Sequence, residues 1–368
     1  MKKPIFKSLF QGFDFTLSTI IFLCSMFGIT AIMSAVHSYD NSLKYIIIQS
    51  AATLIGITGM IVISSIDYNF LGNLSKYIYA CCIALLVLVL LIGTGEDINS
   101  KSWIQIGGFN FQPSELVKIG FVITFSSHLS KIEDVNKPKN LLMLFLHAVP
   151  ILALIMLQPD AGTAMVFVII IIGMLFVAGI SFKYIFGAIA GIGVLLPAIW
   201  PFLQTYQKKR ILVFLNPESD PLGAGYHVIQ SKIAIGSGKI FGKGLFNGTQ
   251  TQLGFLPAKH TDFIFAVIGE ELGLVGAALV FLLLMALVIR CVYVSNLSKN
   301  SLGTYICVGI AFMFAAHIFE NIGMCIGLMP VTGIPLPFFS YGGSSVISNY
   351  IAAGIVINVY KQRRRILY

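Results

Sequence analysis

The sequence predicts an all-α integral membrane protein that crosses the bilayer about ten times. Hydrophobic residues make up 57% of the 368-residue chain and charged residues only 11%, whereas soluble domains carry roughly a quarter charged residues. The apolar runs recur along nearly the whole chain, which excludes a soluble domain with one anchor. A spanning helix needs about 20 mostly apolar residues. We therefore expect a polytopic bundle, formed as a single domain over residues 1–368.

The spans can be placed one after another by hydropathy. The basic start is followed by an apolar run with no small-residue cleavage site, so it is expected to be a first span and not a cleavable signal peptide. The predicted spans are roughly 15–36, 43–65, 75–93, 113–130, 140–157, 161–181, 184–203, 263–290, 303–327 and 340–360. Only a few residues join the fifth span to the sixth, which predicts a helical hairpin.

Lysine and arginine predict the orientation, because short cytoplasmic loops carry an excess of both. With a cytoplasmic N-terminus, the inner side collects most of the basic residues outside the longest loop. They are Lys2, Lys3, Lys7, Lys131, Lys137, Lys139, Lys183, Arg290, Lys299, Lys361, Arg363, Arg364 and Arg365. Both termini are therefore expected on the cytoplasmic side of the membrane.

Two outer segments are predicted to carry function. The first, 93–113, contains Trp103; the second, 204–262, lies between spans seven and eight and is too long for a simple connection. The second mixes glycines with lysines such as Lys239 and Lys243. Glycines let backbone N–H groups approach an anion, and lysines add charge, so the mixture suits a pyrophosphate. The net charge of +9 is scattered along loops, which argues against nucleic acid as a partner.

Acidic residues within the spans are candidates for function, because charge inside a bilayer is costly and usually lines a polar cavity. Glu115, Asp160, Glu270 and Glu320 are such residues. Glu115 and Lys118 are three residues apart and share one helix face, so they can neutralise each other. The pair can be a structural ion pair or can line a cavity and orient a substrate, and the two interpretations are compatible.

Asp262 is the strongest catalytic candidate. It lies where the long outer loop enters the eighth span, so its carboxylate can reach a headgroup at the membrane boundary and act as a general base. The alternative is that Asp262 caps the helix that follows it. His227 and His260 are other candidate bases, although a hydrogen-bonded loop histidine is the commoner case; His37, His128, His147 and His317 are expected to be structural or interfacial.

The last outer loop contains Pro330, Pro335 and Pro337, followed by Gly342 and Gly343. Prolines this close together prevent a regular helix. Irregular backbone at membrane depth is tolerated only where protein or a wet cavity covers it. We therefore expect this loop to line the same outward cavity as Asp262.

Several motifs, in order, resemble the SEDS family (shape, elongation, division, sporulation), with a match from about residue 14 to residue 360. They are 111–116 (FQPSEL), 158–163 (QPDAGT), 260–265 (HTDFIF), 269–273 (GEELG) and 333–345 (GIPLPFFSYGGSS). Residues 216–227 and 248–253 favour the RodA-like elongation branch over the FtsW-like division branch, although a sporulation role is not separated from an elongation role. Lys239 departs from the family, which commonly has a glycine there.

The resemblance implies a peptidoglycan glycosyltransferase that uses lipid II and undecaprenyl-linked glycan. It implies work with a class B penicillin-binding protein in the cell-elongation machinery. It also assigns Asp262 as the essential aspartate, Glu115 and Lys118 as the cavity ion pair, and Trp103 as the outer-loop tryptophan. Ser344 is expected to face the substrate. Arg210, Lys239 and Lys243, or a divalent cation (Mg²⁺ or Mn²⁺) whose ligands the sequence does not fix, would neutralise the pyrophosphate.

Two other functions remain open at this stage. A lipid II flippase would use the same acidic, basic and glycine-rich features, but it needs a polar route through the whole bilayer, and inner-half charges are sparse. A non-catalytic scaffold that activates a penicillin-binding protein would not need buried acids or an outer loop rich in glycine and lysine.

Overall fold

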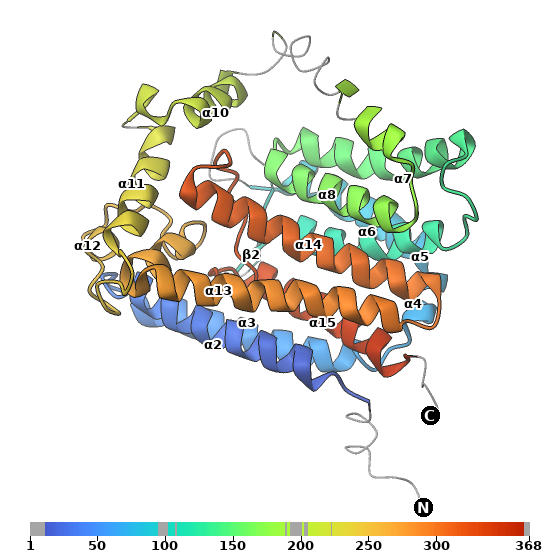
Figure 1. The fold of residues 1–368 in the computed structure, drawn as a ribbon, viewed down its shortest axis with the longest axis horizontal. Coiled ribbons are helices and arrows are strands. Elements are labelled where there is room, and N and C mark those ends of the chain that lie inside the picture. The colour runs from blue at the N-terminus through green and yellow to red at the C-terminus, as the bar shows by residue number, and fades with distance from the viewer. Residues whose placement is uncertain are drawn as a thin grey trace, which may run out of the picture.

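Long helices run side by side through most of the chain (Figure 1). The structure is a computed structural model and describes residues 12–94, 102–106, 109–187, 190–191, 201, 205–221 and 223–363. Its long helices are α2 (Phe15–Ala35), α3 (Ser42–Ile63), α5 (Ser75–Ile92), α6 (Pro113–Leu129), α7 (Pro138–Leu157), α8 (Ala161–Val177), α13 (Ile264–Leu297), α14 (Ser301–Ile326) and α15 (Gly343–Lys361). The shorter elements are α4 (Tyr68–Asn73), α10 (Thr205–Leu215), η2 (Pro217–Ser219), α11 (Ala224–Ser237), α12 (Thr249–Gln252), β1 (Ile104–Ile106) and β2 (Phe109–Phe111).

The long helices coincide with the predicted spans to within a few residues at most ends. The exceptions are α13, which continues to Leu297, and the predicted span 184–203, most of which lies outside the described residues. Among the described residues, six helices are long and apolar enough to cross a membrane by length and composition alone: α2, α3, α5, α7, α13 and α14. The chain is thus mostly helical and polytopic.

Helices α6 and α15 are less apolar than those six because other helices surround them. Nearly every side chain of α6 is buried, including Glu115 and Lys118. Helix α15 likewise buries polar residues such as Ser348 and Asn349. The outer helices have apolar side chains on their exposed surface, such as Leu91 of α5 and Phe145 of α7, and these can contact lipid. A helix inside the bundle does not need an apolar surface all round.

The two ends of the described chain meet. Arg363 donates a hydrogen bond to the carbonyl oxygen of Gly12, so α2 begins where α15 ends. Next to this contact, the Asp14 carboxylate holds Arg290 of α13 at 2.8 Å. Helices α10, α11 and α12 gather at the end of the molecule opposite α4 (Figure 1). The predicted long outer loop and a predicted inner turn thus lie at opposite ends.

Close helix approach depends on small residues. Helix α15 crosses α3 with Gly354 directly against the backbone of Met60, where a Cβ atom would collide. Gly56 of α3 likewise faces the ring of Tyr350. Small residues allow membrane helices to pack this closely. The contact brings the start of α15, with Ser344, into the centre of the bundle.

The first outer segment folds into a small antiparallel hairpin. Ile104 of β1 pairs with Phe111 of β2, and Trp103 forms an isolated bridge with Thr94. The hydroxyl of Ser102 donates to the carbonyl of Gln158 at 3.5 Å. This contact fixes Trp103 close to the turn between α7 and α8.

Candidate functional site

The segment from His260 to Asp262 is held by its backbone. The three successive carbonyl oxygens accept hydrogen bonds from Tyr341 N (2.8 Å), Ser340 Oγ (2.6 Å) and Asn321 Nδ2 (2.8 Å). The first two donors belong to the proline-rich segment and the third to α14. Asp262 is therefore fixed against two elements that are distant in sequence.

His260 packs among three tyrosines. Its ring centroid lies 5.7 Å from that of Tyr39, 5.1 Å from Tyr45 and 5.4 Å from Tyr341. Burial, reinforced by the charge of Lys259, lowers the pKa of His260 to about 4. His260 is thus neutral at physiological pH and serves as a packing residue that anchors the Asp262 segment to the α2–α3 turn.

Lys259 secures the same segment from the other side. Its ammonium is buried and donates to Ser38 Oγ at 2.8 Å and to the Thr251 carbonyl at 2.6 Å. It also lies 4.7 Å from the centroid of the Tyr39 ring. Burial lowers the pKa of Lys259, and the charge of Glu271 opposes this shift. Lys259 is therefore engaged in structure and does not point toward an open site.

The Asp262 carboxylate lies beside Gly333. Asp262 is half-buried, and Gly333 adopts a φ of +73°, a conformation that favours glycine. A Cβ atom at position 333 would stand 3.6 Å from Asp262 Oδ2. Helix α13 begins at Ile264 with Phe263 in the N-cap position. Asp262 thus lies one residue before the N-cap position, against the proline-rich segment.

His227, the other candidate base, lies on α11. Its ring stacks on that of Phe263 with centroids 6.0 Å apart, and burial lowers the pKa of His227. This contact joins α11 to the start of α13. It supports a packing role for His227.

A buried ion pair between α6 residues lies close to the same part of the bundle. Lys118 Nζ lies 2.8 Å from Glu115 Oε1, with the two side chains only 1% and 3% exposed. Lys118 Nζ also lies 2.6 Å from His317 Nε2, and Ser348 Oγ donates to Glu115 Oε2 at 3.2 Å. The predicted pair is confirmed as a contact, and it links α6, α14 and α15.

The hydrogen-bond directions fix the tautomer of His317. A lysine ammonium only donates, so His317 Nε2 accepts and Nδ1 carries the proton. Nδ1 then donates to the Pro335 carbonyl, 3.2 Å away. His317 therefore connects the ion pair to the proline-rich segment that holds Asp262.

Sequence reasoning missed this connection. His317 was expected to be structural or interfacial, and Asn321 was not singled out. Residues 317 and 321 lie one turn apart on the same face of α14. Polar residues at that spacing within an apolar helix were the available signal.

Three helix N-termini converge near Ser344. The backbone N–H of Gln112, at the start of α6, donates to Ser344 Oγ at 3.4 Å at the start of α15. The Gln112 side chain reaches Asp160 Oδ2 at 3.4 Å. Asp160 caps α8 by accepting from Thr163 N at 2.9 Å. Helix N-termini carry partial positive charge, so this region favours an anion.

The long outer loop inserts into α13 where that helix breaks. Gly273, at φ +64°, interrupts the helical backbone. The N–H groups of Lys243 and Gly244 bond the carbonyls of Glu270 and Glu271, and those of Leu274 and Val275 bond the carbonyls of Lys239 and Ile240. The glycine-rich loop thus replaces hydrogen bonds that the broken helix lacks.

Glu270 is the centre of this insertion. Its carboxylate is fully buried and accepts from Lys243 Nζ (2.8 Å), Gln250 N (2.8 Å) and Thr251 N (2.9 Å). The neighbouring Glu271 accepts from Ser34 Oγ of α2. The structure therefore gives Lys243 an ionic partner about 9 Å along α13 from the start of that helix at Ile264, at 1.5 Å per residue.

Lys239 and Arg210 are the other two residues that the sequence predicts to bind the pyrophosphate. Lys239 is exposed and adopts a φ of +51°, which accounts for the glycine that the family commonly has there. Arg210 belongs to α10, and its side chain lies outside the described part of the chain. The pyrophosphate contacts of Arg210, Lys239 and Lys243 stay predictions.

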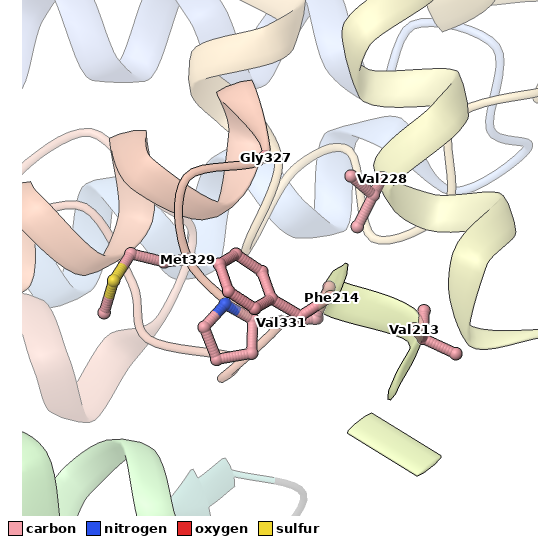
Figure 2. A pocket seen from close by; sticks show the side chains of 7 residues that line it. Val213, Phe214, Val228, Gly327, Met329 and Val331 are labelled. Carbon is pink, nitrogen blue, oxygen red and sulfur yellow. The ribbon is translucent and has the colours of Figure 1, made fainter. Parts of the chain in front are cut away.

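An apolar hollow separates α10 and α11 from the turn after α14 (Figure 2). Its lining residues come from these elements and from the start of the proline-rich segment. They are Val213, Phe214, Val228, Gly327, Met329, Pro330 and Val331. The hollow ends two residues before Gly333, the neighbour of Asp262.

Within the described ranges, no three His, Cys, Asp or Glu side chains come together as a group that could hold a metal ion. Mg²⁺ commonly binds one or two carboxylates and completes its shell with substrate phosphates and water. Asp262 and Asp160 are oxygen donors of this kind, so the expected cation would depend on ligands from the substrate. Its identity stays a prediction.

These features define a multi-pass inner-membrane protein that keeps a buried polar cluster beneath one anchored loop carboxylate. The chain belongs to the cell cycle protein family of FtsW, RodA and SpoVE, whose sequence profile matches residues 14–365.

Curated relatives cover most of the chain. The peptidoglycan glycosyltransferase MrdB of Escherichia coli (strain K12) is 40% identical over 84% of this chain and 84% of its own length. The stage V sporulation protein E of Bacillus subtilis is 37% identical over 95% of this chain and 98% of its own length.

Solved structures agree with the fold. A chain from a peptidoglycan synthase complex that coordinates polymerization and crosslinking matches with a TM-score of 0.82 and 28% identity, covering 95% of this chain and 97% of that chain. A mutant of the rod shape determining protein RodA of Thermus thermophilus matches with a TM-score of 0.73 and 25% identity, covering 96% and 99%. The RodA-like resemblance is confirmed.

Proposed function

We propose that this chain is a peptidoglycan glycosyltransferase that polymerises lipid II on the outer face of the inner membrane during cell elongation. The observation that carries the proposal is the Asp262 carboxylate, which lies beside Gly333 on a segment whose three backbone carbonyls, of residues 260–262, are hydrogen-bonded. The buried Glu115–Lys118 pair is connected through His317 to the same proline-rich segment. The family membership and the glycosyltransferase names of the relatives support it.

The proposed topology has ten spans, cytoplasmic termini and the loop 204–262 outside, all within one domain of residues 1–368. Two observations support it. Gly12 and Arg363 lie together at one end of the bundle, and α10, α11 and α12 lie at the end opposite α4 (Figure 1). Asp262 would then face the side on which the lipid-linked sugar is used.

In the proposed reaction, Asp262 acts as the general base. It removes the proton from the 4-hydroxyl of the acceptor sugar as that oxygen attacks the anomeric carbon of the donor. The bond between the anomeric carbon and the pyrophosphate oxygen breaks, and undecaprenyl pyrophosphate leaves with the electron pair. One displacement of this kind inverts an α donor bond into a β product bond.

The pyrophosphate is expected near the starts of α6, α8 and α15. Helix N-termini bind anions through free N–H groups and the helix dipole, and Ser344 adds a hydroxyl there. Trp103 lies near this region through Ser102 and would line the sugar path. Arg210 and Lys239 would add positive charge from the outer loop. A divalent cation, when bound, would supply further neutralisation of the leaving group.

The lipid chain has a candidate place in the apolar hollow beside α10 and α11 (Figure 2). Its empty volume of about 310 Å³ has room only for the start of an isoprenoid chain, next to the headgroup. Its position two residues from Gly333 would leave that headgroup at Asp262. We further propose a class B penicillin-binding protein as the partner, in keeping with the synthase complex that this chain resembles.

The test is a reconstituted polymerisation assay with labelled lipid II and the cognate class B partner. Wild type is compared with Asp262→Asn and with Asp40→Asn, a matched control at an exposed acid on the α2–α3 turn. We expect glycan chains from wild type and Asp40→Asn but none from Asp262→Asn. Equal polymer from all three preparations would refute the base assignment. No polymer from any, with the partner bound and crosslinking, would favour a flippase or a scaffold.

A further inference from the structure

Glu320 is a buried carboxylic acid without a compensating partner. Its exposed fraction is 0%, and among the described residues neither carboxyl oxygen has a hydrogen-bond partner. The other buried glutamates differ: Glu115 is paired with Lys118, Glu270 with Lys243, and Glu271 with Ser34. An unsatisfied buried group in a native structure requires a physical explanation.

The charged groups around Glu320 do not compensate an ionised carboxylate. Lys118 of α6 faces it, but the ammonium already donates to Glu115 and His317. His317, on the same helix, is neutral because Lys118 donates to it. Asp160, at the start of α8, also faces Glu320, and a second acid offers no positive charge to compensate it. Burying an unpaired charge costs several kcal/mol or more, so the neutral acid is the favoured form.

The hydroxyl of Thr332 faces Glu320 from the proline-rich segment. Thr332 Oγ1 is also buried and lacks a hydrogen bond of good geometry within the described chain. Gly162 of α8 packs tightly against Thr332, where a Cβ atom would collide. The next residue, Gly333, is the one beside Asp262 Oδ2. Thr332 therefore connects Glu320 to the Asp262 carboxylate through one peptide unit.

We propose that Glu320 is a positioning residue that works as a neutral carboxylic acid, donating its proton in a hydrogen bond to Thr332 Oγ1 and so fixing Gly333 against Asp262. The proposal rests on the proposed function only in naming Asp262 as the base. Glu320 does not touch the substrate. Ionisation would remove the donor and place an uncompensated negative charge beside Thr332, which would move Thr332 and Gly333.

The protonation state can be measured directly in the intact protein. Infrared difference spectra of wild type against Glu320→Gln, at neutral pH in lipid, should contain the carbonyl stretch of one protonated carboxylic acid. The control pair, wild type against Glu133→Gln, changes an exposed inner-loop acid and should lack that band. A carboxylate band in place of the acid band would overturn the proposal, whatever the protein's activity.

The positioning role is tested by kinetics with the partner-bound enzyme. Glu320→Gln keeps a neutral donor and should keep kcat within about twofold of wild type at neutral pH. Thr332→Val removes the acceptor and should lower kcat about tenfold with little change in KM, since small misplacement of a catalytic group is costly. Thr58→Val, at an exposed position of α3, is the matched control.

Two further outcomes would count against the proposal. They are loss of activity in Glu320→Gln as complete as in Asp262→Asn, and wild-type kcat in Thr332→Val. If wild type makes no polymer, the proposed function fails, but the infrared result still decides whether Glu320 is neutral. The two hypotheses can therefore fail separately.

Discussion

The side-chain amide of Asn321 donates a hydrogen bond of 2.8 Å to the carbonyl oxygen of Asp262. The same nitrogen donates to the Ile334 carbonyl at 2.8 Å. One residue of α14 thus joins the catalytic candidate to the proline-rich segment. The Asp262 carbonyl also accepts from Cys325 Sγ at 3.8 Å, but a thiol is a weak donor compared with an amide.

We predict that Asn321→Asp destabilises this site. An aspartate removes the donor and sets an acceptor against two buried carbonyls, and leaving buried polar groups unsatisfied costs about 1–3 kcal/mol. Polymerisation should fall about tenfold or more, together with the thermal midpoint in detergent. Asn296→Asp, at an exposed position of α13, should change neither. Wild-type behaviour of the Asn321 variant would contradict the assigned role.

The Glu115–Lys118 pair should not tolerate reversal. A swap to Glu115→Lys with Lys118→Glu keeps one charge of each sign, but Lys118 also donates to His317 and Glu115 also accepts from Ser348. The swapped groups would face the wrong partners, so we expect the double variant to remain at least about tenfold below wild type. Restored polymerisation would show that the pair acts as a simple ion pair. Both single variants are measured alongside.

The ion pair between Glu270 and Lys243 leads to a prediction about stability. Removing Glu270 frees Lys243 and the N–H groups of Gln250 and Thr251 together, whereas Lys243→Met leaves those N–H groups bonded. Glu270→Ala should therefore lower the thermal midpoint more than Lys243→Met. Both are expected to cost about 1–5 kcal/mol, the range for breaking buried charged contacts.

Lys243→Met also separates two roles of that lysine. A structural role predicts a lower midpoint with KM for lipid II nearly unchanged. A pyrophosphate-binding role predicts a raised KM with little change in stability. Substrate titration and thermal unfolding on the same preparation distinguish them.

Lys239→Gly should stabilise the protein. A lysine at φ +51° pays the steric cost of a left-handed backbone, about 1–2 kcal/mol, part of which is offset by the extra freedom of glycine in the unfolded chain. The expected gain is about 1 kcal/mol or less, seen as a higher thermal midpoint. Lys232→Gly, inside helix α11, should have the opposite sign at about 1 kcal/mol. A lower midpoint for Lys239→Gly would contradict this account.

His260 predicts an acid dependence of stability. Its pKa falls from 6.5 to about 4 on folding, so the unfolded chain binds a proton at pH values where the folded protein does not. Its contribution is present above about pH 6.5 and is lost as the pH falls toward 4. His260→Phe should reduce the fall of the thermal midpoint across that window, while His37→Phe, at an exposed histidine, should not. Parallel curves for wild type and His260→Phe would refute the prediction.

Much of the fold follows from the sequence because length and hydropathy alone decide which segments enter a bilayer. The long helices between α2 and α8, together with α14 and α15, begin and end close to the predicted spans for this reason, and α13 begins close to one. The Glu115–Lys118 contact also followed from helical spacing, since residues three apart share one face. Asp262 was chosen from hydropathy, because it lies where the long loop enters a predicted span.

The residues that hold the site were not readable from local pattern. The carbonyls of residues 260–262 are bonded by Asn321, Ser340 and Tyr341, from 59 to 81 positions away in the chain. Their pairing depends on how α14 and the proline-rich segment fold back on α13. The glycine-rich loop likewise had the composition of an anion site, yet Gly238, Gly242 and Gly248 pack against α13 near its break.

The sequence by itself determined a multi-pass α-helical membrane protein, the places of most of its spans, and the acids and cations worth testing. Those features are local, because they depend on the free energy of transferring one segment into lipid and on side chains a helical turn apart. Only the tertiary structure decided that Lys243 is paired with Glu270, that His317 joins the ion pair to the proline-rich segment, and that Glu320 is left unpaired. Whether a buried charge is compensated depends on the groups that other segments bring within about 3 Å, and hydropathy carries no information about them.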